Sequence, residues 1–273
     1  MPSTPVFLRP MHAACLLAVL ASLAGGTARA ADDGAGPPET TRVRAGQPPR
    51  RSAPDFLFGR PRTVIGVSGG WLVASESGGI FDFTRTFLTV NDGDFGTGMF
   101  RFTFGRSVSP RLDLMVEGGF SHATITSAYR DFVDSDGLEI VQTTELTQGP
   151  LGGSVRFWLI PRGREVGRFA WVPNRIAPYV GVGGGTYRYH FTQSGDFVDF
   201  VDLSIFTDRL ESSGWTPSGH VFGGASVNLM PQLFANVEGR YVWANTPPSR
   251  DFVGFDNIDL NGLRITVGIE YLF

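Results

Sequence analysis

Residues 261–273, Asn-Gly-Leu-Arg-Ile-Thr-Val-Gly-Ile-Glu-Tyr-Leu-Phe, carry the clearest structural signal in the chain. Apolar or aromatic side chains occupy one parity of this segment, from Leu263 to Phe273, whereas Arg264 and Glu270 fall on the other parity. Successive side chains of a β-strand point to opposite faces of the sheet. The segment therefore predicts a strand with one apolar face and one charged face, ending on an aromatic residue.

Further segments with the same alternation precede this one and are separated by turn signals. They cover residues 63–73, 100–104, 112–121, 142–159, 176–192, 218–229 and 233–243. Short turns near 107–111 and 230–232 contrast with long connections near 75–97, 131–142, 193–213 and 246–260. Counting the last strand, the sequence predicts an all-β, eight-stranded antiparallel arrangement with its short turns at one end.

Strand number, alternation, turn asymmetry and the terminal phenylalanine make residues 61–273 resemble the eight-stranded bacterial outer-membrane β-barrel superfamily, which includes the OmpA transmembrane domain, OmpX and OmpW. The resemblance implies an up-and-down transmembrane barrel whose apolar parity faces the lipid of a Gram-negative outer membrane, including lipopolysaccharide. Tyr271 and Phe273 resemble the terminal signal that the barrel assembly machinery recognises. The rival interpretation is a secreted lipocalin-like barrel, which would place its apolar parity inside.

The amino terminus predicts export. Arg9 and His12 precede an apolar run, Ala13–Ala24, and the small residues around Arg29 follow it. This is the pattern of a cleaved secretory signal peptide, which we place at residues 1–30. Residues 31–60 are rich in proline and glycine and predict a flexible periplasmic tail.

Composition excludes several classes of function. The only cysteine, Cys15, lies in the predicted signal peptide, so a mature chain would hold no disulfide, thiolate metal site or cysteine nucleophile. The formal net charge of −3 argues against a nucleic-acid partner. No apolar run approaches the roughly 18 residues of a membrane-spanning helix.

If the apolar parity faces lipid, a set of ionisable side chains faces the lumen. This set comprises Arg101, Asp113, Glu117, Arg156, Arg188, His190, His220, Glu238, Arg240, Arg264 and Glu270. An eight-stranded barrel is just wide enough for side chains to fill it, and buried charges need partners. We therefore expect a salt-bridged polar interior, and the alternative is a porin-like passage for small, mainly hydrophobic molecules, as in OmpW-like proteins.

Signals for catalysis or metal binding in the predicted strands are weak. His190 and His220 lack a third candidate metal ligand. Ser121 and His122 are neighbours in a strand and must face opposite sides, which prevents them from forming a nucleophile–base pair. Ser218 shares a face with His220 but no carboxylate motif completes a triad. We expect no enzymatic activity, and a lipid A-modifying barrel enzyme is the second alternative.

The long connections repeat the motif Asp-Phe-Val and are acidic, whereas the short-turn end is basic. Their carboxylates include Asp131, Asp134, Asp196, Asp199, Asp251 and Asp256. The phenylalanines and valines could pack as a cap over the barrel mouth, or the carboxylates could bind a divalent cation. Apart from that cation, we expect no cofactor. The connection 161–175 contains four arginines and predicts a segment at the inner membrane surface. The expected role is structural or surface interaction, with no specific ligand indicated.

Overall fold

The computed structural model describes residues 56–75, 78–91, 93–254 and 256–273. The predicted signal peptide, residues 1–30, and most of the predicted tail lie outside the described residues. The elements are β1 (Leu57–Phe58), β2 (Thr63–Ala74), α1 (Gly79–Phe87), β3 (Thr97–Ser109), β4 (Leu112–Val133), β5 (Glu139–Trp158), β6 (Gly163–Val166), β7 (Ala170–Pro173), β8 (Ile176–Val198), β9 (Ile205–Met230), β10 (Leu233–Trp243), β11 (Asn245–Thr246), the 3-10 helix η1 (Arg250–Phe252), β12 (Ile258–Asp259) and β13 (Gly262–Leu272). In the described part, no helix has the length and apolar character needed to cross a membrane.

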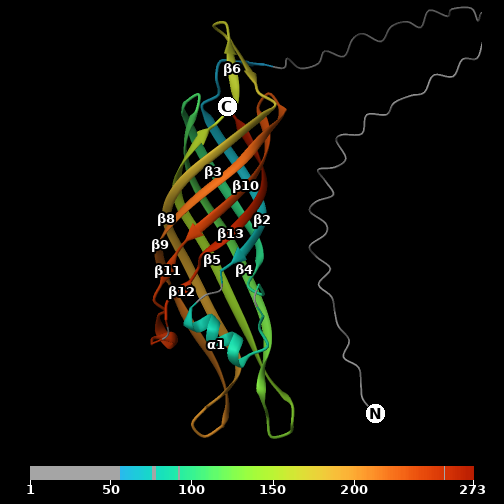
Figure 1. The fold of residues 1–273 in the computed structure, drawn as a ribbon, viewed down its shortest axis with the longest axis vertical. Coiled ribbons are helices and arrows are strands. Elements are labelled where there is room, and N and C mark those ends of the chain that lie inside the picture. Colours follow the sequence, from blue (N-terminus) through green and yellow to red (C-terminus); the bar gives the residue numbers. More distant parts are fainter. Residues whose placement is uncertain (1–55, 76–77, 92, 255) are drawn as a thin grey trace, which may run out of the picture. The chain divides into compact units, whose positions relative to one another are not determined.

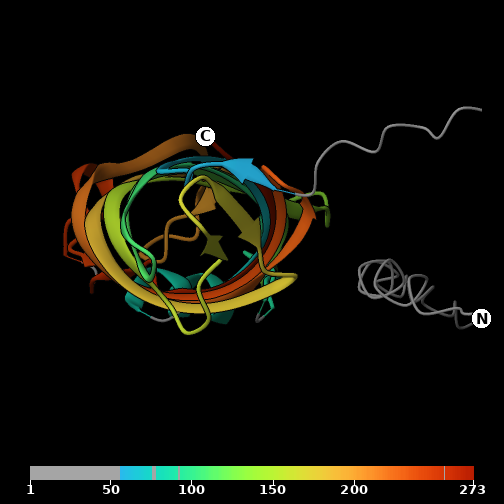
Figure 2. The same cartoon turned by 90° about the horizontal axis from the view of Figure 1, so that it is seen from above.

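Eight strands close into a barrel in the order β10-β13-β2-β3-β4-β5-β8-β9, and each neighbouring pair is antiparallel. Barrel strands that follow one another in the chain are neighbours, and β13 completes the ring by pairing with both β10 and β2. Figures 1 and 2 show the ring from the side and from above. The predicted eight-stranded antiparallel up-and-down barrel is confirmed.

The outer wall of the barrel carries an apolar band. On β13 the outward side chains run from Leu263 to Tyr271, and on β2 they run from Ile65 to Val73. Most outward positions across the band are apolar, aromatic, glycine or proline, whereas charged residues such as Glu238 are buried inside. β10 and β13 are 11 residues long, as a transmembrane strand requires. The barrel is therefore a transmembrane barrel, and a lipocalin-like arrangement is excluded.

Strand β8 faces the opposite way from the predicted orientation. Tyr179, Tyr187 and Tyr189 are buried in the lumen, and Arg188 lies on the exposed outer face. The sequence allowed either face of this strand to point outward, because valines occupy the parity opposite the row of glycines and tyrosines. The tyrosines point inward because their hydroxyl groups find polar partners there, such as Glu238 for Tyr179.

Four strands extend far beyond the band. β4, β5, β8 and β9 contain 22, 20, 23 and 26 residues, about twice the length of β10 or β13. They form two long hairpins, β4–β5 and β8–β9, that project at the bottom of Figure 1. We call these the surface hairpins. Much of the predicted loops 131–142 and 193–213 is therefore strand, because β5 continues to pair with β8 as far as Gln142 and Gly195.

A hydrophobic core fills the long-loop end of the barrel. Helix α1 places Phe81 against Phe95 and Phe191, with ring centroids 5.1 and 6.4 Å apart. Phe252 of η1 also packs on Phe191, at 5.3 Å. This core, which we call the cap, contains buried Phe81, Leu88, Val90, Phe95, Tyr129, Ile140, Leu146, Tyr187, Tyr189, Phe191, Val198, Val242, Ala244, Phe252, Ile258 and Leu260. Apolar loop residues therefore cover the barrel mouth from inside.

A small sheet of order β1-β7-β6 covers the short-turn end, where the carboxyl terminus lies (Figure 1). Figure 2 looks down on this end and shows the yellow β6–β7 hairpin crossing the opening. Trp171 of β7 is buried against Met115, Phe234 and other barrel residues, so the connection 161–175 covers the barrel instead of lying along the membrane surface. The predicted tail also ends earlier than residue 60, because Leu57 and Phe58 pair with β7.

Candidate functional site

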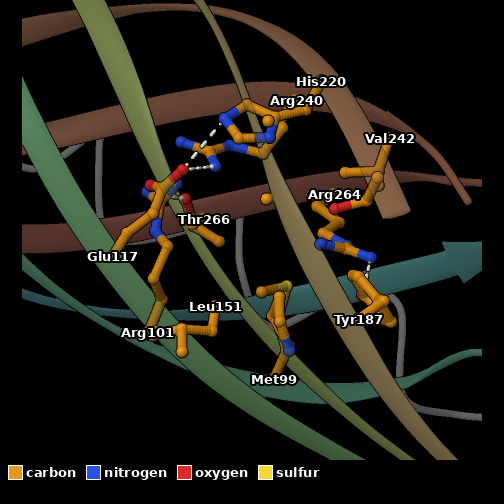
Figure 3. Close-up of a pocket in the computed structure, with 16 residues that line it drawn as sticks. Met99, Arg101, Glu117, Leu151, Tyr187, His220, Arg240, Val242, Arg264 and Thr266 are labelled. Atoms are coloured by element: carbon orange, nitrogen blue, oxygen red, sulfur yellow. Dashed lines mark hydrogen bonds and ion pairs between the residues drawn. The ribbon is translucent and has the colours of Figure 1, made fainter. Parts of the chain in front are cut away.

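The middle of the lumen holds two arginines and two glutamates that pair across the barrel, and Figure 3 shows three of them, Arg101, Glu117 and Arg240. Arg101 of β3 donates to Glu238 of β10 at 2.5 Å and lies 3.7 Å from Glu117 of β4. Arg240 of β10 pairs with Glu117 and lies 3.1 Å from Glu238. Each carboxylate therefore meets both guanidinium groups, and the four side chains join strands that lie on opposite sides of the ring.

Further polar groups complete the partners of these charges. Tyr179 donates its hydroxyl to Glu238 at 3.0 Å, and His220 Nε2 lies 2.9 Å from Glu117 Oε1. Arg101 also donates to Ser68 and Thr266. A buried charge that loses its partner costs about 3–5 kcal/mol, so such a set is stable only when it is complete.

A second layer of charge closes the short-turn end. Arg156 pairs with Glu270 at 2.8 Å, and Arg162 pairs with Asp113 at 2.9 Å. Asp113 also accepts the indole N–H of Trp158 at 2.8 Å. The guanidinium of Arg162 lies over the Trp158 ring, 4.7 Å from its centroid.

Arg162 was missed by the sequence analysis. It follows the end of β5, in a connection that was expected outside the barrel, yet its side chain is buried. Strand parity holds no information about such a residue. The one available signal for a buried arginine was Asp113, near the first residue of β4, which has no partner in the strand pattern. A buried carboxylate needs a cation nearby.

Arg264 has no carboxylate partner among the contacts of the described residues. It donates to the hydroxyl of Tyr187 and lies over that ring, 5.1 Å from the centroid. Tyr187 in turn donates to Gln148 at 3.3 Å. Beside Arg264 lies a cavity of about 30 Å³, close to the volume of one water molecule. The lumen therefore contains space for water beside Arg264.

The structure places nine of the eleven predicted lumen residues inside the barrel. They are Arg101, Asp113, Glu117, Arg156, His220, Glu238, Arg240, Arg264 and Glu270. Arg188 and His190 do not belong to the lumen, because β8 faces the other way. Arg188 lies outside over the ring of Trp215, at 5.7 Å, and His190 bonds to Thr192 at 3.1 Å.

The loop carboxylates serve local structure. Asp134 accepts backbone N–H groups of Asp136 and Leu138, which closes the tip of the β4–β5 hairpin. Asp196 accepts the hydroxyl of Thr207 at 2.6 Å. Asp199 accepts the N–H of Val201, and Asp251 accepts the N–H of Glu211. Asp131 and Asp256 are exposed. Among the described residues, no group of three or more acidic, histidine or cysteine side chains could hold a metal ion.

The serine–histidine pairs are not arranged for nucleophilic catalysis. Ser121 is buried and His122 is exposed, so they lie on opposite faces of β4. Between Ser218 and His220, no hydrogen bond is present in the described part of the chain, and His220 is engaged by Glu117. A serine nucleophile needs its base within hydrogen-bonding reach.

The terminal aromatics lie on the outer wall at the short-turn end. Tyr271 and Phe273 are exposed, and Tyr271 donates its hydroxyl to Gln232 at 2.6 Å. The backbone of Phe273 pairs with Thr63 at the start of β2. Recognition of these residues by the assembly machinery stays a prediction.

The structure combines a closed ring of eight strands with an apolar band on the outside and paired charges on the inside. The fold is an eight-stranded antiparallel transmembrane barrel. In outer-membrane barrels, short turns lie at one end and longer loops at the other. This chain has the same asymmetry, with turns at Pro110 and Pro231 on the side of the carboxyl terminus.

Solved structures of outer-membrane proteins are similar to this chain. The outer membrane protein OprG from Pseudomonas aeruginosa is 11% identical, covering 80% of this chain and 98% of its own, with a TM-score of 0.45. Neisserial surface protein A is 13% identical, covering 78% and 97%, with a TM-score of 0.41. The outer membrane protease OmpT from Escherichia coli is 12% identical, covering 79% and 98%, with a TM-score of 0.40. Neither a family model nor a curated protein sequence matches the chain.

Proposed function

We propose that the chain is an integral protein of the bacterial outer membrane, closed to ions, that presents its two surface hairpins for interaction outside the cell. The short-turn end would face the periplasm and the long-loop end the exterior. The export signal at residues 1–30 and the apolar band support this location. Absence of enzymatic activity stays a prediction.

The observation that carries the closed state is the filling of the lumen. Three successive layers occupy it: the Arg162–Asp113 layer, the ring of Arg101, Glu117, Glu238 and Arg240, and the cap. A hydrated ion crossing the barrel would have to separate buried charge pairs and then displace an apolar core. Each of these steps is opposed by several kcal/mol.

The surface hairpins supply the interaction surface. At the β8–β9 tip, Val201 is 94% exposed and Leu203 is 61% exposed, beside Asp199 and Asp202. The backbone N–H of Ser204 bonds to the Asp202 carboxylate and lowers its pKa, so this group is ionised at neutral pH. Exposed apolar residues with an acidic surround favour a partner that has an apolar centre and a basic rim.

Conductance across a planar bilayer tests the closed state. We expect the purified, folded full chain to insert without producing current steps, because buried charge pairs and the cap fill the lumen. Reproducible steps in symmetric salt would contradict this part of the proposal. A porin inserted in the same membrane serves as the positive control for detection.

A second candidate function is passage of small apolar molecules through the barrel wall. The β4–β5 ladder pairs Gly118 with Leu151 and Ser121 with Gln148, but the residues between, opposite Gly149 and Pro150, are not paired. Proline has no N–H for a ladder hydrogen bond. The cavity beside Arg264 reaches this weak point, because its lining includes Gly118, Pro150 and Leu151.

Uptake of an apolar fluorophore into proteoliposomes distinguishes the second candidate from a closed barrel. If the wall opens here, Pro150→Val restores the missing donor and slows uptake, whereas conductance stays absent in both proteins. Uptake no faster than in protein-free vesicles would remove this candidate.

A further inference from the structure

A pocket of about 470 Å³ lies at the short-turn end, between β3, the segment before β2 and the β6–β7 hairpin. Four arginines line it, Arg60, Arg62, Arg106 and Arg168, together with one acid, Glu165. We call it the basic pocket. It borders the Arg162–Asp113 layer, because its lining includes Ser107, which accepts a hydrogen bond from Arg162 and donates one to Asp113.

The arginines of this pocket are not neutralised by the fold. Arg60 donates to the backbone carbonyl of Ser109. Arg62, Arg106 and Arg168 are exposed, and their guanidinium groups make no hydrogen bond or ion pair with the described residues. Several cations around one cavity repel each other, and an anion bound between them would remove that repulsion.

Backbone hydrogen bonds fix the segments that carry these arginines. Arg62 N–H bonds to the carbonyl of Phe273 at 3.1 Å, and the Arg62 carbonyl accepts from Ser107 at 2.7 Å. Gly59 N–H bonds to the carbonyl of Phe169 at 2.9 Å, which fixes the hairpin against the same wall. A preformed arrangement of donors lowers the entropy lost when a ligand binds.

Two exposed apolar residues, Val108 and Phe169, lie among the polar lining of the pocket, and we refer to them as its apolar rim. They are 60% and 74% exposed. Arg106 and Val108 share the outward parity of β3 with Phe102 and Phe104 of the apolar band. Arginines beside exposed apolar residues suit a ligand that has an anionic head and an apolar tail.

We propose that the basic pocket binds the phosphate of an anionic phospholipid from the membrane leaflet at the short-turn end. The guanidinium groups of Arg62, Arg106 and Arg168 would donate to the phosphate oxygens, while the acyl chains lie along the apolar wall below Val108. The site requires a bilayer around the barrel, as the proposed function does. It does not depend on the closed lumen or on the surface hairpins.

Lipid retention measured by native mass spectrometry tests the site. The full chain, delipidated in detergent, is mixed with equal amounts of phosphatidylglycerol and phosphatidylcholine, and bound lipid is counted. We expect the protein to retain phosphatidylglycerol selectively. The triple variant R62Q/R106Q/R168Q should lose selectivity by roughly tenfold to hundredfold, since a basic residue near a lipid surface contributes about a factor of five.

The matched control is R111Q/R164Q/R175Q, which removes three exposed arginines of the same end that do not line the basic pocket. It should retain the selectivity of the unaltered protein. Equal losses in the two triple variants, or no loss in either, would overturn the proposal. If the pocket variant fails to fold, R106Q alone is used, because this exposed side chain makes no hydrogen bond or ion pair with the described residues.

Competition with inorganic phosphate distinguishes a lipid headgroup from a free phosphate. We expect millimolar phosphate to displace little phosphatidylglycerol, because the apolar rim adds contacts to the acyl chains. Complete displacement would show that the site takes the free anion, and the lipid assignment would fall. Neither result affects the conductance test of the closed lumen.

Discussion

Single glycines decide which way β8 faces. A Cβ atom on Gly183 would meet His220, the carbonyl of Gly153 and the side chain of Ser154, and a Cβ atom on Gly181 would meet the Phe222 ring. The inward glycines of β8 therefore leave room for the large side chains of β9. The same glycines let Tyr179 lie beside Phe222, with ring centroids 6.2 Å apart.

Replacement of Gly183 by alanine tests this packing. We expect Gly183→Ala to lower the free energy of unfolding by about 1–3 kcal/mol, because the added methyl group has no space. Gly219→Ala is the control, since a Cβ atom there meets nothing within 4 Å, and its change should stay within about 0.5 kcal/mol. Urea unfolding in micelles measures both, and equal effects would contradict the packing argument.

Three buried side chains, Arg101, Arg240 and His220, approach Glu117. Glu117→Ala would leave the two buried guanidinium groups with Glu238 as their shared carboxylate, and we expect a loss of about 3–5 kcal/mol. Glu139→Ala removes an exposed glutamate at a hairpin tip and should change stability by less than about 0.5 kcal/mol. A loss below 1 kcal/mol for Glu117→Ala, measured in the same urea series, would show that the charges are not coupled as described.

At the scale of elements, helix α1 and the surface hairpins form one unit. Phe87 of α1 lies 5.0 Å from Phe200 of the β8–β9 connection, and Phe132 of β4 lies 5.8 Å from the same ring. The edge of β4 is also occupied, because Thr89 exchanges hydrogen bonds with Ala128. The first loop therefore pairs with the edge of β4, an exposed strand edge that would otherwise be free to associate with other chains.

Removal of a central ring of the cap should loosen that unit alone. We expect Phe81→Ala to destabilise the cap by about 3–5 kcal/mol and to raise the exchange rates of the amides around Leu88 and Tyr129. Amides of β10 and β13 within the apolar band should exchange as before. Thr86→Ala, on the exposed face of the same helix, is the control. Uniform acceleration across the barrel would mean that the cap is not a separate unit.

At the scale of the whole molecule, charge and exposure differ between the two ends. The long-loop end presents acids and exposed apolar residues at the hairpin tips, whereas the short-turn end presents the basic pocket. The apolar band separates these surfaces, and buried charge pairs and the cap fill the lumen between them. The interaction proposed at the hairpin tips and the lipid site proposed at the basic pocket therefore lie on separate surfaces.

The double variant V201S/L203S tests the surface hairpins without altering the barrel. In lipid nanodiscs, the unaltered protein should bind a synthetic peptide of alternating lysine and leucine residues, more weakly as salt is raised. The variant should bind at least about tenfold more weakly, because two exposed apolar contacts are lost, and its thermal unfolding should not change. Undiminished binding by the variant would remove the tip from the proposed interaction surface.

Much of the barrel follows from alternation alone. In β13, Arg264 and Glu270 separate apolar residues with period two, so one face must meet lipid and the other must be polar. The same reasoning placed Arg101, Glu117 and Glu238 inside, because charge on a lipid-facing wall is too costly. The terminal aromatic residues were predicted from the parity of the last strand. The positions of the short turns were predicted from the turn signals between the alternating segments.

Tertiary structure decided the rest, because the relevant forces act between strands distant in sequence. Alternation in β8 offers two faces of similar polarity, and the choice depends on the space that Phe222 and His220 need. Arg162 enters the lumen because Asp113 and Glu270 are there, and no local pattern records that. Local alternation determined the wall, whereas the filling of the lumen depended on complementary shape and charge across the closed ring.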